Sequence, residues 1–324
     1  MILAPLRGVT IRCFREVFAD VIREAGFTEA ITPFIAANPG YDPLKDRELQ
    51  TSKLPNLQTS KPLVVTPQFI GKDPAALRSC LERIKAAGYA TADLNCGCPY
   101  PMVRSKGRGS GLLKTPAVLE KMIAVGCEVM GEGNFSIKAR LGVERSDELL
   151  SLMPMINAYP LRFLTVHART ARQMYSGKCD WDAFDRIAAA AKVPLVRNGD
   201  LSMPGDVAAC SHCTPSDPRG IFPIVRRVTH EAFPHCTPSD SRGFPDLPVM
   251  IGRSFIVALG ERDDIGALLR RYIAASAAEL SGDASVLGRL KELIAYWKFL
   301  PAWHRRWNVV KICRSVDELL GFMI

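Results

Sequence analysis

A thiol on a tight turn is the group with the clearest chemical potential in this 324-residue chain. An apolar stretch ends in Asn95 and breaks at once into a Gly-Cys-Pro turn that carries Cys98. Parallel α/β folds keep their chemistry at such C-terminal ends of strands. Cys96 and Cys98 are too closely spaced for the usual half of a zinc site, and no second half follows at matching spacing. The turn therefore indicates a reactive or proton-donating thiol, with a purely structural cysteine as the alternative.

The elements that must position this thiol alternate regularly along the first 260 residues. Apolar stretches predict strands at residues 1–5, 29–33, 63–70, 91–95, 135–140, 162–167, 194–198 and 248–253. Amphipathic stretches predict helices at residues 13–25, 73–88, 115–130, 146–158, 182–191 and 254–260. This alternation predicts a (β/α)8 TIM barrel with its active face at the C-terminal strand ends. A doubly wound sheet is the alternative, but it would concentrate polar residues at one crevice, whereas here they follow nearly every strand.

A longer motif around the thiol resembles the signature of a known family. The string Leu94-Asn-Cys-Gly-Cys-Pro99, a valine at 103 and a Gly-x-Gly-x-x-Leu-Leu ending at Leu113 resemble the tRNA-dihydrouridine synthases, which are flavoenzymes that reduce uridine in tRNA. Other stretches between residues 2 and 253 fit the same family. The resemblance implies that NADPH reduces FMN, that flavin N5 delivers hydride to C6 of a uracil, and that Cys98 protonates C5. A thiol with an ordinary pKa is mostly protonated at neutral pH, which suits a general acid.

The resemblance also implies roles for the residues at the strand ends. Those expected at the cofactor are Pro5, Leu6 and Arg7 along the flavin, Gln68, Lys138 and His167 at its ring and ribityl chain, and Asn198, Gly199, Asp200, Gly252 and Arg253 at its phosphate. Those expected at the RNA are Asn95, Arg140 and Arg169, the last of which could face the cofactor instead. The target base would leave its stack to reach the flavin, so the substrate would be a loosely structured RNA.

The residue types at these positions support a flavin independently. A cationic Lys138 can stabilise the anionic N1–C2=O edge of a reduced flavin, and Gln68 can hydrogen-bond the polar edge of its ring. Glycine amides after strands seven and eight of a barrel often bind one phosphate, which favours FMN over a dinucleotide. Taken singly, each side chain could equally be solvated or satisfied by local backbone.

One region departs from barrel spacing. Residues 198–252 exceed one βα unit, and an inserted loop at about 210–246 contains a near-duplicate, in which residues 212–220 recur as 235–243. A metal clip is one interpretation, built from Cys210, His212, Cys213, His230, His235 and Cys236. We favour a surface loop produced by local duplication, because no accepted ligand spacing is met, and we predict no bound metal.

Residues 261–324 are predicted to form a small helical domain after the barrel (residues 1–260). Helices are expected at residues 263–281 and 285–299 and from about residue 316. Basic residues here alternate with aromatic ones: Arg289, Lys291, Lys298, Arg305, Arg306, Lys311 and Arg314 with Tyr296, Trp297, Phe299, Trp303 and Trp307. In one interpretation, the basic side chains bind phosphates and the aromatic ones stack on bases. In the other, the aromatic side chains form the core of a helix bundle and the basic ones its solvated face. The resemblance favours tRNA docking, with Arg305, Arg306 and Lys311 as contacts.

Composition limits the class of protein. A net charge of +9 and a pI near 9.1 favour a polyanionic partner. Ten cysteines without regular spacing, and no recognisable leader, lead us to expect a cytoplasmic protein, and no apolar run approaches the roughly 18 residues of a membrane span. We expect a monomer. Two other functions stay open: a small-molecule pyrimidine flavoenzyme of the dihydroorotate or dihydropyrimidine dehydrogenase type, and a non-catalytic RNA-binding protein.

Overall fold

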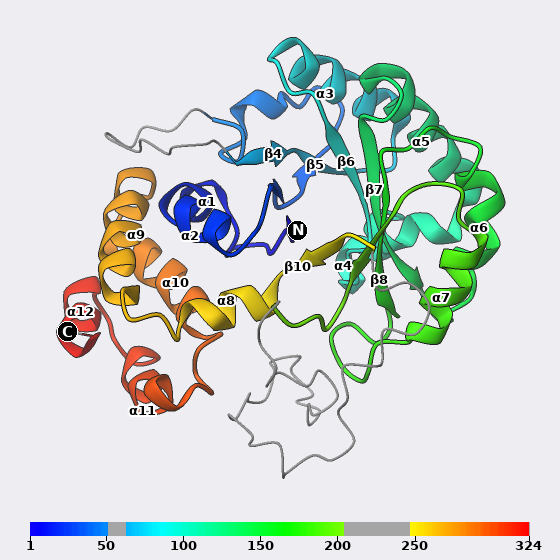
Figure 1. Cartoon of the computed structure of the whole chain (residues 1–324). Helices are drawn as coiled ribbons and strands as arrows, with labels where there is room; N and C mark the ends of the chain where they lie inside the picture. The colour runs from blue at the N-terminus through cyan, green and yellow to red at the C-terminus, as the bar shows by residue number, and fades with distance from the viewer. Residues whose placement is uncertain (51–62, 204–246, 324) are drawn as a thin grey trace.

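The computed structural model describes residues 1–50, 63–203 and 247–323. The predicted inserted loop at about 210–246, with the candidate metal-clip residues, lies outside these described ranges. Within the ranges, no helix has the length and hydropathy needed to cross a membrane. The described strands form one parallel sheet that curls around the centre of the molecule (Figure 1).

The sheet closes on itself as a barrel. Its strands are β1 (Ile2–Leu3), β2 (Glu29–Ile31), β3 (Ile35–Ala36), β4 (Val64–Thr66), β5 (Gln68–Ile70), β6 (Ala92–Cys96), β7 (Phe135–Gly142), β8 (Leu164–Thr170), β9 (Leu195–Asn198) and β10 (Val249–Ile251). Their order is β3-β5-β6-β7-β8-β9-β10-β1-β2-β4. Segments β2 and β3 are two halves of the second strand, and β4 and β5 are two halves of the third, interrupted at Pro67. Because β2 pairs with β4 and β3 pairs with β5, the two ends of this order are parts of the same two neighbouring strands, the second and the third. The sheet is therefore closed. The predicted TIM barrel is confirmed, and the doubly wound alternative is wrong.

Helices follow most of the strands and cover the outside of the barrel (Figure 1). They are α1 (Arg12–Val17), α2 (Ala19–Glu24), α3 (Pro74–Ala86), α4 (Pro101–Arg104), α5 (Pro116–Met130), α6 (Glu148–Ile156), α7 (Trp181–Ala190) and α8 (Arg253–Leu259), with short 3-10 turns η1 (Pro43–Lys45) and η2 (Gly109–Lys114). Helix α3 begins after Asp73, whose carboxylate accepts hydrogen bonds from the amides of Ala75 and Ala76. The single helix predicted at residues 13–25 is divided at Phe18 into α1 and α2.

Alternation along the strands separates two environments. On β6, Leu94 and Cys96 belong to the hydrophobic core that includes residues of the covering helices α3, α5, α6 and α7, whereas Asp93 and Asn95 point the other way. An ion pair at the N-terminal end of the barrel shows that this other face is the barrel interior. Arg162, just before β8, holds both carboxylate oxygens of Glu29 on the non-neighbouring strand β2, at 2.7 and 2.9 Å. Alternation therefore directs Cys96 into the outer packing.

Four C-terminal helices pack beside α1, α2 and α8 (Figure 1). They are α9 (Ile265–Glu279), α10 (Asp283–Ile294), α11 (Pro301–Val310) and α12 (Val316–Met323), of which α11 was not predicted. They share one continuous hydrophobic core with the barrel's own helices α1, α2 and α8. Trp297 and Trp303 are 0% and 2% exposed, and their indole N–H groups donate to the carbonyls of Ile256 and Gly260, at 2.6 and 2.7 Å. These two tryptophans are therefore core residues and not base-stacking surfaces.

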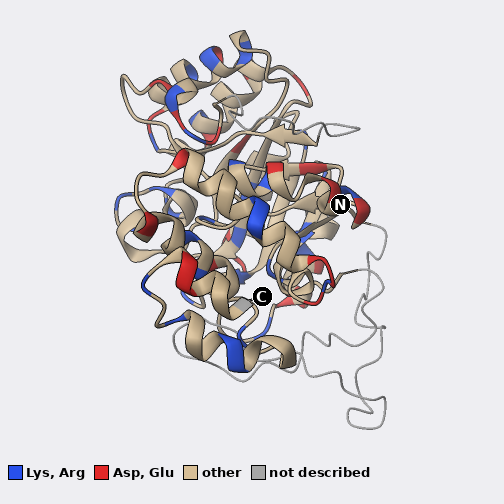
Figure 2. Cartoon of the chain, turned by 90° about the vertical axis from the view of Figure 1, so that its left-hand side faces the viewer, with Lys and Arg blue, Asp and Glu red and all other residues tan. Residues whose placement is uncertain are grey.

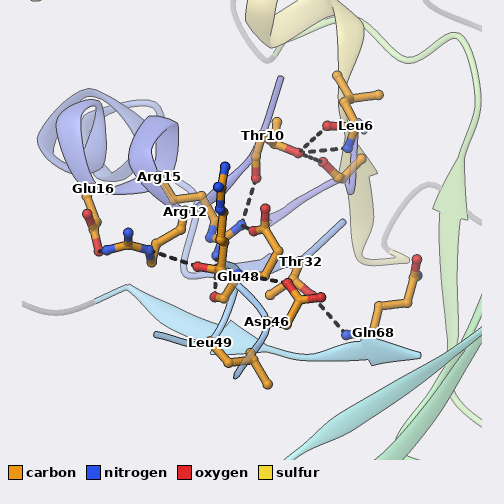
Figure 3. A network of polar contacts seen from close by, with 12 residues as sticks. Leu6, Thr10, Arg12, Arg15, Glu16, Thr32, Asp46, Glu48, Leu49 and Gln68 are labelled. Atoms are coloured by element: carbon orange, nitrogen blue, oxygen red, sulfur yellow. Dashed lines mark hydrogen bonds and ion pairs between the residues drawn. The ribbon is translucent and has the colours of Figure 1, made fainter. Parts of the chain in front are cut away.

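Two buried arginines of α1 bind the segment that connects β3 to β4 (Figure 3). Arg15 donates to the carbonyl of Thr10 at 2.8 Å and to the Glu48 carboxylate at 2.7 Å. Arg12 donates to the carbonyl of Arg47 at 2.9 Å and also pairs with Glu279 at the end of α9. The same helix thus holds a barrel loop on one side and the C-terminal helices on the other.

Candidate active site

A chain of side-chain hydrogen bonds inside the barrel leads to the cysteine turn, which we define as residues 95–99. The buried Asp93 carboxylate accepts from Gln68 Nε2 at 2.7 Å, and Gln68 Oε1 accepts from Asn95 Nδ2 at 2.8 Å. Asn95 Oδ1 in turn accepts from the backbone amides of Gly97 and Cys98, at 3.1 and 2.9 Å. A carboxylate can only accept, so it determines which way both amide side chains face. The oxygen of Asn95 is therefore directed at the turn that carries Cys98.

Asp93 was not predicted as a site residue, and it is fully buried. Burial raises its pKa to about 6, although hydrogen bonds from Ser136 and Gln68 oppose the rise. Period-two alternation was the available signal, because it places residue 93 on the same face as Asn95. We predicted that Gln68 contacts the flavin and that Asn95 contacts the RNA. In the structure, both side chains use one amide hydrogen and the amide oxygen for the hydrogen bonds of this chain. Gln68 is fully buried and Asn95 is nearly so.

Cys98 lies in a confined position and is 6% exposed. Its carbonyl accepts from the amide and the hydroxyl of Ser110, at 3.2 and 2.9 Å. Gly109 has φ +58, and a Cβ atom there would lie 2.8 Å from the Cys98 Cβ, so this position requires glycine. Burial raises the pKa of the Cys98 thiol, opposed by the Tyr100 amide and by the charges of Arg140 and Arg7. The thiol is therefore protonated at neutral pH.

Basic side chains gather in the barrel interior beside this turn. Lys138 Nζ donates to Asn198 Oδ1 at 2.8 Å across β8, and Asn198 Nδ2 donates to the Met250 carbonyl at 2.8 Å. Burial and the nearby Arg140 lower the Lys138 pKa to about 7. Burial, with Arg140 and Lys138, also lowers the pKa of His167 well below its usual value, so the imidazole is neutral. The strand register brings these predicted residues together, since Asn95 pairs with Lys138, and His167 with both Arg140 and Asn198.

Arg140 was predicted to bind RNA, but it is 2% exposed. Its guanidinium donates to the carbonyl of Gly97 at 3.0 Å, and to the carbonyls of Thr170 and Met174 at 2.9 and 2.6 Å. It therefore joins the cysteine turn to the loop after β8. Met174 in that loop has φ 52, which a non-glycine residue adopts only when its surroundings hold it there.

Tyr175 in the same loop lies between two guanidinium groups. Its ring centroid is 5.2 Å from Arg140 Cζ and 5.0 Å from Arg253 Cζ. Cation–π contacts of this length are attractive, and more so where water is excluded. The loop after β8 is thereby held over the same end of the barrel as the cysteine turn.

Arg169, predicted to face the RNA or the cofactor, is fully buried. It pairs with both oxygens of Asp200 and donates to the carbonyls of Ser176 and Gly177, at 3.2 and 2.5 Å. Asp200, predicted in the phosphate loop, also accepts from Arg253 at 3.0 Å. A carboxylate that binds two arginines orients both of them. In the described structure Arg169 and Asp200 thus position the loop after β8 and Arg253, and their contacts to a ligand stay predictions.

The remaining predicted cofactor residues lie around the same end of the barrel. A Cβ atom on Gly199 would meet Cys179 Sγ at 2.7 Å, and one on Gly252 would meet the Ala4 Cβ at 3.1 Å, so neither position has room for a side chain. Leu6 lies beside Gly252, while Pro5 is half-buried and Arg7 is exposed, with its guanidinium 5.5 Å from the Phe34 ring centroid.

The C-terminal helices also reach this region. The carboxylate of Glu292 on α10 touches Gly8, and Arg7 is among the charges that act on its pKa. Sequence reasoning missed Glu292, since nothing local marks a helix residue that packs on a loop near the other end of the chain. Arg305, Arg306 and Lys311 are exposed on and just after α11. Figure 2 shows that Lys and Arg positions are interspersed with Asp and Glu positions over this side of the molecule. Two other basic residues of this region bind protein groups instead. Arg289 donates to the Glu279 carboxylate at 3.0 Å, and Lys291 donates to the carbonyl of Cys313 at 2.6 Å.

The donor set fits an anionic ligand. Among the described residues, four basic side chains, Lys138, Arg140, Arg169 and Arg253, share this region with two carboxylates, Asp93 and Asp200. An excess of buried positive charge raises the free energy of the folded protein unless an anion neutralises it. Among the described residues, no group of three or more His, Cys, Asp or Glu side chains could hold a metal ion.

Comparison with known proteins agrees with this arrangement. The family model described as dihydrouridine synthase (Dus) matches residues 2–217, which is two thirds of the chain. The chain belongs to the dihydrouridine synthase family. The match covers β1 through β9 and includes the cysteine turn, Lys138, Arg140 and Asp200.

Several bacterial members of the dihydrouridine synthase family are similar in sequence. The tRNA-dihydrouridine(16) synthase of Ralstonia nicotianae is 29% identical over 214 residues, which cover 65% of this chain and 64% of the relative. The tRNA-dihydrouridine synthase B of Vibrio cholerae is 28% identical over 209 residues, 63% of this chain and 61% of the relative. The chain thus spans less than two thirds of the length of these relatives. Among solved structures, morphinone reductase matches with a TM-score of 0.45 and 11% identity over 79% of this chain and 83% of that one, too low to add to the argument.

Proposed function

We propose that this chain is a tRNA-dihydrouridine synthase that uses FMN as its cofactor and NADPH as reductant, and that reduces the C5=C6 bond of specific uridines. One observation carries the proposal. A protonated, positioned thiol and a cluster of basic side chains, among them the buried Arg140 and Arg169, share the C-terminal end of one barrel in the described residues. The first can donate a proton, and the second can hold an anionic, electron-rich ligand.

The residues at this end suit a flavin mononucleotide. Lys138 and His167 would face its ring and ribityl chain, and Gly199, Gly252 and Arg253 would face its phosphate. The backbone amides of both glycines would be the phosphate donors, as is common after strands seven and eight of a barrel. A bound flavin supplies the hydride, which no side chain of this protein can provide. An anion beside Lys138 would raise the pKa of its ammonium from about 7 and keep it charged.

Cys98 would supply the proton. Its S–H bond would break as a C–H bond forms at C5 of the uracil, and a thiolate would remain. The Tyr100 amide and the charges of Arg140 and Arg7 favour that thiolate, so the thiol can release its proton once the substrate is in place. Asn95 and Arg140 act as positioning residues, because one orients the amides of the cysteine turn and the other holds its carbonyl.

The partner would be tRNA. The net charge of +9 favours a polyanion, and Arg305, Arg306 and Lys311 are exposed where a phosphate backbone could reach them. The four C-terminal helices would serve as the docking region, although they share their core with the barrel. A small-molecule pyrimidine dehydrogenase would use the same thiol and cofactor, but it would have no use for these exposed charges.

The proposal is tested by separating the proton step from flavin reduction. Native protein should be yellow, release FMN and not FAD on denaturation, and form dihydrouridine in unmodified tRNA with NADPH. Cys98→Ala should still let NADPH bleach the flavin, while reoxidation by tRNA slows by roughly 100-fold or more. Cys96→Ala is the matched control, because its thiol is buried in the outer packing.

Two outcomes would contradict the proposal. A colourless protein that cannot be reconstituted with FMN would refute a flavoenzyme. Efficient turnover of a free pyrimidine, without any requirement for RNA, would move the chain to the small-molecule dehydrogenases, because remote RNA contacts would then contribute nothing to positioning the base.

A further inference from the structure

Two large, partly apolar side chains are exposed shortly after Cys98 in the chain. Tyr100 is 51% exposed and Met102 is 80% exposed, only two and four residues after Cys98. Exposed apolar side chains that occur together next to a site can mark a binding surface. The other large exposed apolar side chains of the described residues are Leu44, Val64, Ile312 and Phe322, far from this turn in sequence.

The segment that carries them is fixed relative to the thiol. The carbonyl of Gly97 accepts from Arg140 and the carbonyl of Cys98 accepts from Ser110, so the start of the segment is anchored in the buried site. Helix α4 starts on the carbonyl of Tyr100, which accepts from the amides of Val103 and Arg104, at 2.9 and 3.0 Å. A molecule that docks on Tyr100 and Met102 would thus be placed at a set position relative to Cys98.

Charge around the two side chains favours an anionic occupant. Residues 98–114 contain four basic side chains and no acidic one: Arg104, Lys106, Arg108 and Lys114. Arg104 and Lys114 lie 4.0 and 3.7 Å from the Glu144 carboxylate, so Lys106 and Arg108 contribute most of the charge available to a ligand. The exposed Arg7 and the carboxylate of Glu292 act with opposite sign on the pKa of Tyr100. An aromatic ring and a thioether on a segment with this excess of basic side chains suit unpaired nucleotides, because bases stack on aromatic side chains while phosphates meet the charges.

We propose that Tyr100 and Met102 form a stacking surface for the RNA nucleotides that flank the base presented to Cys98. The inference rests on the proposed function and deepens it. When a base leaves its stack, the faces of its neighbours are exposed and stacking energy is lost. Tyr100 offers a flat ring to one such face, and Met102 can fill the vacated space as apolar wedges do in other nucleic-acid complexes. The same segment would then carry the proton donor and keep the neighbouring bases from stacking on each other again.

The first experiment measures affinity for an unmodified tRNA transcript. The double variant Tyr100→Ala/Met102→Ala should bind about 5- to 150-fold more weakly, the range for loss of one stacked base. The slope of log affinity against log salt should not change, because no charge is removed. Val64→Ala is the matched control, since Val64 is 53% exposed but begins β4 at the opposite end of the barrel. Tyr100→Phe should behave like the native protein and shows that a ring, not the hydroxyl, is needed.

The second experiment makes the complementary change in the RNA. A transcript with an abasic residue beside the uridine that the native enzyme reduces should bind the native protein more weakly. The double variant should show no further loss, because the stacking partner is already absent. Equal affinity of the double variant and Val64→Ala would overturn the inference, as would abasic effects that add to those of the double variant. Either result would leave dihydrouridine formation by the native enzyme, and hence the proposed function, intact.

Absence of dihydrouridine formation by the native protein would instead contradict the proposed function. The affinity comparison still decides the inference in that case, because it needs no turnover. Flavin content and melting temperature of each variant check that the fold is retained, and Tyr100→Phe provides a second test if the double variant is unstable.

Discussion

Exchange of the residues at the two ends of the Asp93–Gln68–Asn95 chain provides a sharp test of how the cysteine turn is positioned. Asp93→Asn alone can keep its side-chain oxygen on Gln68 Nε2 and turn its amide nitrogen to the Ser136 hydroxyl, which can accept. Asn95→Asp alone places an acceptor against Gln68 Oε1, and reversal of the Gln68 amide only moves the mismatch to Asp93. In the double variant, a reversed Gln68 amide can donate to Asp at position 95 and accept from Asn at position 93. Asn95→Asp should therefore disrupt the chain, Asp93→Asn should not, and the exchange should restore the chain with opposite polarity.

The magnitudes follow from burial. A rise in the Asp93 pKa from 3.8 to about 6 means that ionised Asp93 costs about 3 kcal/mol above pH 6. Because the folded pKa is raised, the stability tied to Asp93 falls as pH increases from about 4 to 6. Asp93→Asn removes that cost and forces no mismatch, so stability at pH 7.5 should equal or exceed that of the native protein. Asn95→Asp adds both a buried carboxylate and a mismatch, and should lose about 3 kcal/mol or more.

Urea unfolding of the native protein and the three variants at pH 7.5 measures these differences. The double variant should be more stable than the sum of the single effects by about 1–3 kcal/mol, because the mismatch of Asn95→Asp disappears once Asn at position 93 can donate to Gln68. Single effects that add to within about 0.5 kcal/mol would refute the hydrogen-bond chain as we describe it. The stability of Asp93→Asn relative to native protein should also fall when measured at pH 5, where the native carboxylate is partly neutralised.

Three further changes test other parts of the molecule. The Lys138 pKa of about 7 lies below its unfolded value, so the stability of ligand-free protein should rise from pH 7 to about 10.5; Lys138→Met should flatten this rise, and an unchanged pH profile would contradict the assignment. Trp303→Phe should lower the free energy of unfolding by about 2 kcal/mol, because the Gly260 carbonyl loses its donor, and a loss below 0.5 kcal/mol would argue against that bond. Arg305→Glu with Arg306→Glu should reduce the salt slope of tRNA binding by about two units, and an unchanged slope would place the RNA elsewhere.

Sequence reasoning worked where the relevant physics is local. Alternation of apolar and polar residues on β6 directed Cys96 outward and Asn95 inward, and the turn that follows placed Cys98 at a strand end. Regular strand and helix spacing was sufficient for the barrel, since each βα unit repeats the same short-range pattern. The division of the predicted helix at Phe18 and the missed helix α11 are errors of boundary and count, which depend on how neighbouring segments pack.

Partners that lie far apart in the chain are what sequence reasoning could not supply. Arg169 and Asp200 are separated by 31 residues and Arg12 and Glu279 by 267, yet each pair is buried together. An arginine carries the same charge whether it meets a carboxylate or a phosphate, so only its neighbours in space decide whether it can bind RNA. For the same reason Trp303, which suits base stacking in sequence, became a core residue once α8 supplied both apolar contacts and the Gly260 carbonyl.

The sequence by itself determined the fold class, the strand end that carries the thiol, and the family of the chain, because these depend on periodicity and on a contiguous motif. The tertiary structure alone decided which polar residues stay available for a ligand. Burial makes every unpaired polar group costly, so side chains such as Arg140 and Arg169 are taken up by carbonyls and carboxylates that folding brings within reach. What remains exposed beside Cys98 is Tyr100 and Met102, since no distant segment of the described chain folds over them.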